Sequence, residues 1–159
     1  MRRLLFTLLV SLLVLPAAAL AAVRAAGDGT LVVKNATGTI TVAGRGTIFG
    51  HFAKGTLTVV DYNPDDNKDP QVNGATKTFV KSDTTTVYKG TDVRFLFSGG
   101  RYKIVFLGAG IDISAVGTGK VTLLADPNVS DAGSWAVDGR KLQPLPVFTL
   151  TQAPFGVTP

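Results

Sequence analysis

The 159-residue chain contains no cysteine and no glutamate, and it has a single histidine and a single tryptophan. Without cysteine it cannot form a disulfide framework, a thiolate metal site or a cysteine nucleophile. All eleven acidic residues are aspartate, which favours turns over helices. General acid–base chemistry would depend on His51 or on aspartate alone, so the composition argues against an enzyme.

The first 21 residues are typical of a cleavable secretory signal peptide. Two arginines precede an apolar run over 4–15, and Ala19 and Ala21 supply the small residues of an Ala-x-Ala site, which places cleavage after Ala21. We therefore expect a secreted or cell-envelope protein with no stable membrane span after cleavage. The alternative is an uncleaved anchor over 4–23, which is about long enough to cross a bilayer.

Glycines recur every eight to ten residues in two parts of the mature chain. The first array consists of Gly29, Gly38, Gly46 and Gly55, and the second of Gly90, Gly100, Gly110 and Gly119. In the first array each glycine is followed by threonine and an apolar residue, and alternation continues from there. Period-2 alternation bounded by glycine predicts short, half-buried strands.

These patterns predict a single all-β domain over 29–150, built from two similar arrays and a C-terminal hairpin that turns at Asp138-Gly139. Residues 22–28 are expected to form a flexible lead-in and 151–159 a loose tail. One fitting architecture is a short-strand, β-helix-like β-solenoid, in which successive strands stack in parallel and residues 17 apart align. The alternative is an antiparallel β-sandwich, in which each glycine marks a hairpin.

The repeated pattern Gly29-Thr30-Leu31-x-Val33 and Gly38-Thr39-Ile40-x-Val42 resembles the repeats of small secreted bacterial β-solenoid proteins of adhesin or cell-envelope type. The resemblance covers roughly residues 27–61, with an echo over 90–124. It implies a solenoid fold and a structural or adhesive role in the envelope.

An aspartate-rich segment between the arrays is the candidate metal site. Its oxygen-bearing residues are Asp61, Asn63, Asp65, Asp66 and Asp69. The Asp-x-Asn-x-Asp spacing begins like a calcium loop, but the sixth position holds Asp66 in place of glycine and the twelfth holds Val72 in place of glutamate. A helical calcium hand is therefore excluded, and an irregular calcium site or a solvated turn loop remain as alternatives.

The candidate ligand-binding residues are basic and aromatic. Arg101 and Lys103 alternate with Tyr102 and Ile104, so they share one face of a predicted strand and could meet an anionic wall polymer. Trp135 could stack on a sugar or serve as a packing anchor. Loss of the signal peptide leaves 14 basic and 11 acidic residues, a net charge near +3, which is too mild to indicate a nucleic-acid partner.

The sequence thus predicts an exported, non-catalytic structural or interaction protein of the cell envelope that needs no cofactor. Its expected partners are an anionic cell-wall polymer, a glycan or another copy of the chain. A secreted carbohydrate- or calcium-binding module is the main alternative, and a hydrolase is the third.

Overall fold

The computed structural model describes residues 25–157, and within them the chain forms strands and no helix. The strands are β1 (Gly29–Asp61), β2 (Gln71–Ser82), β3 (Thr85–Ala125), β4 (Ser134–Val137), β5 (Gln143–Pro144) and β6 (Thr151–Phe155). They join in one sheet with the order β2-β3-β1-β4-β5, and β6 pairs with β3. The all-β prediction is confirmed.

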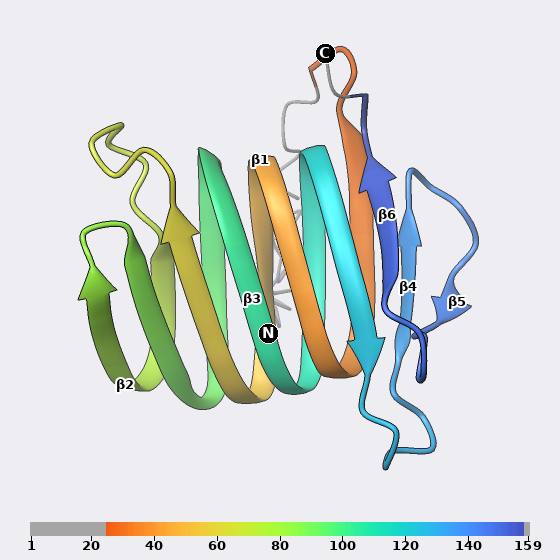
Figure 1. Ribbon diagram of the computed structural model, residues 1–159. Helices are drawn as coiled ribbons and strands as arrows, with labels where there is room; N and C mark the ends of the chain where they lie inside the picture. Colours follow the sequence, from red (N-terminus) through yellow and green to blue (C-terminus); the bar gives the residue numbers. More distant parts are fainter. Residues whose placement is uncertain (1–24, 158–159) are drawn as a thin grey trace, which may run out of the picture.

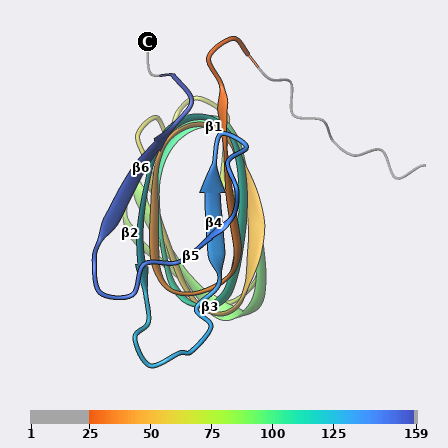
Figure 2. The ribbon, with the colours of Figure 1, turned by 90° about the vertical axis from the view of Figure 1, so that its right-hand side faces the viewer.

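Two very long strands dominate this sheet. β1 runs for 33 residues and β3 for 41, and they wind together as one antiparallel ribbon (Figure 1). Seen from the side in Figure 2, the ribbon outlines a flattened oval. Every strand pair is antiparallel, so the expected parallel stacking of short strands is wrong.

The register shows how the ribbon closes on itself. Most residues of β1 have a partner in β3 on each side; Ile40, for example, faces both Phe106 and Leu123. The two partners are 17 residues apart, so one circuit takes 17 residues. Leu31 and Ile48 therefore align as predicted, but Ala115 of β3 lies between them and pairs with both.

The glycines lie inside the long strands, in two rows that cross neighbouring passes of the ribbon. Gly38 and Gly55 both pair with Gly108, and Gly29 and Gly46 both pair with Gly117. A Cβ atom on Gly108 would overlap the carbonyl oxygen of the adjacent strand and lie 2.8 Å from Gly55 Cα. These glycines permit close approach between strands and do not end them, which corrects the prediction of short strands.

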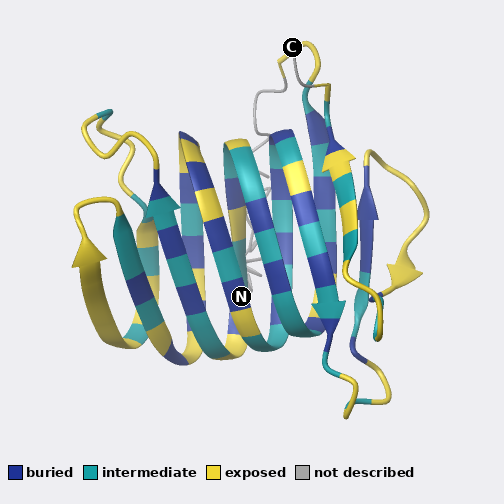
Figure 3. Cartoon of the chain, viewed as in Figure 1, coloured by how far each residue is buried: buried dark blue, intermediate teal, exposed yellow. Residues whose placement is uncertain are grey.

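Alternate residues of the ribbon point into a shared core, as the sequence pattern predicts (Figure 3). Large side chains that are almost wholly buried fill it, namely Leu31, Ile40, Phe52, Leu57, Phe97, Tyr102, Ile104, Phe106, Ile111, Ile113, Leu123 and Phe155. Phe95 stacks against Phe106 at a centroid distance of 4.9 Å. The core is thus a stack of ladders supplied alternately by β1 and β3.

The two ends of the ribbon are finished differently. β2 pairs with β3 at one end, and at the other β4 covers the first pass of β1 while β6 covers the last pass of β3 (Figure 1). The predicted hairpin is present, because β4 and β5 pair across a turn with positive φ at both Asp138 and Gly139. Residues 151–155, expected in a loose tail, instead form β6, where Phe155 is buried.

Candidate functional site

The strongest candidate site begins on the pass of β3 that carries Arg101 and Lys103. Both residues are exposed, whereas Tyr102 and Ile104 between and beside them are fully buried. The predicted shared face of the two cations is therefore present. The strand alternates because its inner residues belong to the core ladders.

The antiparallel register brings two further cations to the same face. Arg45 of β1 is directly opposite Arg101, and Ala43 lies between Lys103 on one side and Lys120 on the other. Lys120 stood out in the sequence as a basic residue beside the second array, but Arg45 did not. Its signal was the register itself, which only the pairing of β1 with β3 reveals.

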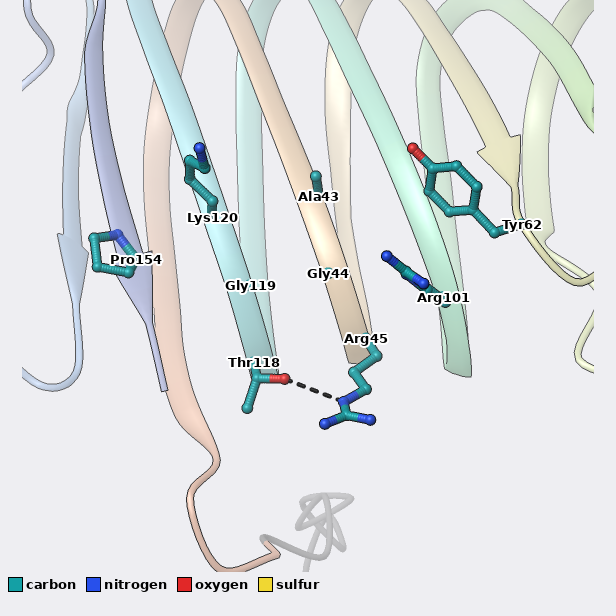
Figure 4. Close-up of a pocket in the computed structure, with 9 residues that line it drawn as sticks. All are labelled: Ala43, Gly44, Arg45, Tyr62, Arg101, Thr118, Gly119, Lys120 and Pro154. Carbon is teal, nitrogen blue, oxygen red and sulfur yellow. Dashed lines mark hydrogen bonds between the residues drawn. The ribbon is translucent and has the colours of Figure 1, made fainter. Parts of the chain in front are cut away.

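These residues border an open groove of about 500 Å³, shown in Figure 4. It is lined by Ala43, Gly44, Arg45, Tyr62, Arg101, Thr118, Gly119, Lys120 and Pro154. Its floor is made by alanine and glycine, so the longer side chains stand around a hollow. We call Arg45, Arg101, Lys103 and Lys120, together with this hollow, the basic groove.

Local contacts orient three of its side chains. Arg45 Nε donates to Thr118 Oγ1 at 3.4 Å, the bond drawn in Figure 4. The guanidinium carbon of Arg101 lies 5.3 Å from the centre of the Tyr62 ring, within cation–π range. Lys120 Nζ donates to Gln152 Oε1 of β6 at 3.4 Å. None of these partners is a carboxylate, so the positive charge of the groove is not neutralised by them.

The charge balance around the groove is positive. Within residues 25–157 the ion pair that the structure contains is His51–Asp112, and no carboxylate pairs with the four cations. Asp28 lies on the neighbouring hollow that Arg45 and Thr118 also line. Asp61 is only 8 % exposed, and its Oδ1 accepts a hydrogen bond from Asn63 N.

The predicted calcium loop is held by its own backbone contacts. Asp61 Oδ1 and Asp66 Oδ1 accept bonds from the backbone N–H two residues on, at Asn63 and Lys68. Asp65 and Asp69 are exposed. Over the described part of the chain, no three acidic or histidine side chains gather as a metal cluster. The solvated-turn alternative matches these contacts better than a calcium site does.

A buried tyrosine fastens this loop beside the groove. Tyr102 Oη donates to the Lys68 carbonyl, and Lys68 Nζ donates to the Gly99 carbonyl at 3.3 Å. Burial raises the pKa of Tyr102 to about 12, and the negative charges of Asp61, Asp66 and Asp69 raise it further in the same direction. Tyr62, which begins the loop, is thereby kept close to Arg101.

Trp135 is a packing residue. Its side chain is 5 % exposed, it belongs to the core, and it pairs with Val33 of β1 and Gln143 of β5. Stacking on a sugar would need an open ring face. The proposed ligand role of Trp135 is therefore corrected to the packing-anchor alternative.

His51 lies on the other broad face of the ribbon. Its Nδ1 is 3.4 Å from Asp112 Oδ2, and the two side chains are 42 % and 41 % exposed. Asp112 Oδ1 also accepts a bond from Asn35 N at 2.9 Å, so the carboxylate is already engaged. The outward orientation expected for His51 agrees with this exposure.

The predicted cleavage site at Ala19 and Ala21 lies outside the described residues. Within 25–157 there is no helix with the length and apolarity needed to span a bilayer. In comparisons with known proteins, no family model, no curated protein and no solved structure matches this chain.

Proposed function

We propose that this chain is an exported, non-catalytic interaction protein of the cell envelope, and that the basic groove is the surface that meets an anionic partner. The observation that carries the proposal is the convergence of Arg45, Arg101, Lys103 and Lys120 from two strands, without carboxylate partners among the described residues. Uncompensated positive charge beside a hollow favours an anionic ligand.

The chemistry around the groove favours binding over catalysis. Its nine lining residues include no carboxylate and no histidine, so they offer no general acid or base near neutral pH. The hydrolase alternative would depend on His51 and Asp112, which lie on a different face and whose carboxylate is held by Asn35 N.

We also propose that the wound ribbon is a variety of β-solenoid, in which two antiparallel strands replace parallel coils. The 17-residue offset between the two β3 partners of each β1 residue supports this view, since it sets a constant circuit. Such a scaffold is suited to display, because it holds outward side chains in rows at the strand spacing of about 4.8 Å.

The test measures retention of the processed protein, residues 22–159, on immobilised polygalacturonate and on neutral dextran. We expect retention on the polyanion alone, decreasing as salt rises because the contacts are between exposed charges. Arg101→Ser with Lys103→Ser should abolish it. The control, Arg94→Ser with Lys34→Ser, removes the same charge at exposed positions outside the groove.

Two results would contradict the proposal. One is failure to bind the polyanion at low salt. The other is equal loss in the groove variant and the control variant, which would show that net charge alone is responsible. For the envelope location, protein recovered from the envelope fraction should begin at Ala22 on N-terminal sequencing.

A further inference from the structure

We infer that the basic groove selects phosphate over carboxylate, with Arg45 and Arg101 forming the phosphate site for a linear phosphate-bearing polymer. This inference rests on the proposed function and makes its ligand specific. It starts from an arrangement that costs stability in the unbound protein.

Arg45 and Arg101 are directly opposite each other on neighbouring strands. Opposed residues of an antiparallel pair have Cβ atoms roughly 4.5–5.5 Å apart, and like charges at that distance repel. Both side chains are exposed on the same face, so neither is separated from the other by the core. An anion with several oxygen atoms would convert this repulsion into two attractions.

The contacts of the two guanidinium groups leave the donors that a phosphate needs. Arg45 uses Nε for Thr118 Oγ1, which leaves its two terminal nitrogens. Arg101 lies over the face of Tyr62, a contact that uses no in-plane N–H. Figure 4 shows both groups at the same end of the groove, on either side of the register that joins them.

The number of ligand oxygens decides between the two anions. A carboxylate has two oxygens in one plane and is satisfied by one arginine fork. A phosphate presents its oxygens tetrahedrally and can accept from two forks at once. Two adjacent arginines, fixed by a threonine and a tyrosine, therefore match phosphate better than they match a uronic acid.

The remaining cations indicate a polymer. Lys120, Arg45 and Arg101 lie on three successive strands, and Lys103 lies two residues from Arg101 on the third. At about 4.8 Å per strand, the cations form a line that crosses the strands. Between them the floor is Gly44 and Gly119, which leaves room for a chain to lie in the groove.

The test compares linear polyphosphate with polygalacturonate at equal charge concentration, by calorimetry, for the processed protein and for Arg45→Lys and Arg101→Lys. These substitutions keep each charge but remove the planar fork. We expect polyphosphate to bind about tenfold more tightly than polygalacturonate, and each variant to lose about tenfold for polyphosphate alone. Arg94→Lys is the matched control and should change neither affinity.

Each outcome bears on a different part of the inference. Equal affinity for the two polymers, with variants that match the parent, would overturn phosphate selection while leaving polyanion binding intact. Absence of binding to both would overturn the proposed function as well. Tighter binding to phosphatidylglycerol vesicles than to polyphosphate, lost in the same variants, would overturn the polymer and assign the phosphate to a lipid headgroup.

Discussion

Alanine substitutions at three glycines test whether neighbouring passes of the β1–β3 ribbon are in contact. At Gly108 the backbone φ is one that any residue adopts, but a Cβ would overlap the Lys54 carbonyl oxygen. At Gly139 the opposite holds: φ is +70°, and nothing lies within 4 Å of the added atom. Gly46 combines both conditions, with φ at +132° and Gly117 Cα 2.7 Å away.

The expected costs follow from these two causes. Gly108→Ala should destabilise by about 1–3 kcal/mol, because the obstacle is backbone and the strands must move apart. Gly139→Ala should cost about 1–2 kcal/mol from the left-handed conformation, partly offset by the lower entropy of the unfolded chain. Gly46→Ala should cost about 2–5 kcal/mol, since strain and overlap act together.

Urea unfolding followed by the fluorescence of Trp135, the chain's one tryptophan and a core residue, would give the three free energies. The order expected is Gly46→Ala worst, Gly108→Ala next and Gly139→Ala mildest. If Gly108→Ala proved as mild as Gly139→Ala, the glycine rows would not be sites of close strand approach, and the account of the 17-residue circuit would fail.

Three further predictions concern the core, the loop and calcium. Tyr102→Phe should cost about 1 kcal/mol by removing the bond to the Lys68 carbonyl. The pKa of Tyr102 is raised from 10.0 to about 12, so the folded parent holds its proton more tightly; stability that is complete below pH 10 should fall between pH 10 and 12, and Tyr102→Phe should flatten that fall in urea titrations. Phe106→Ala should cost about 3–5 kcal/mol by thermal unfolding, whereas Phe148→Ala, at a 91 % exposed position, should stay within about 0.5 kcal/mol; equal effects would contradict the assigned core. Calcium followed by a chelator should leave the melting temperature unchanged, and a reversible shift would restore the calcium-loop alternative.

The inward residues of the ribbon could be predicted from sequence because alternation is a local property. Leu31 and Val33, and likewise Ile40 and Val42, were expected on one face and are buried. Arg101 and Lys103 were placed on the outer face by the same rule. A period of two specifies which side each residue faces, whatever strand it pairs with.

The length and direction of the strands could not be predicted in this way. A glycine that allows a tight turn and a glycine that allows close strand approach look the same in sequence. The matched spacings of the two arrays also have a pairing explanation, because Gly46 faces Gly117 and Gly55 faces Gly108 in opposite chain directions. Arg45 joined the site only through that long-range register.

The interleaving of β1 with β3 has a consequence for how the chain reaches its native state. Thr41 pairs with Val105 and Thr122, so β1 finds both of its hydrogen-bonded neighbours only after most of the chain has been made. Such high contact order slows folding, because distant segments must meet before any pass is complete. A chain that stops after β2 would have two unpaired edges along β1 and its apolar row uncovered, a state prone to aggregate. Folding should therefore follow, and not accompany, passage of the chain out of the cell.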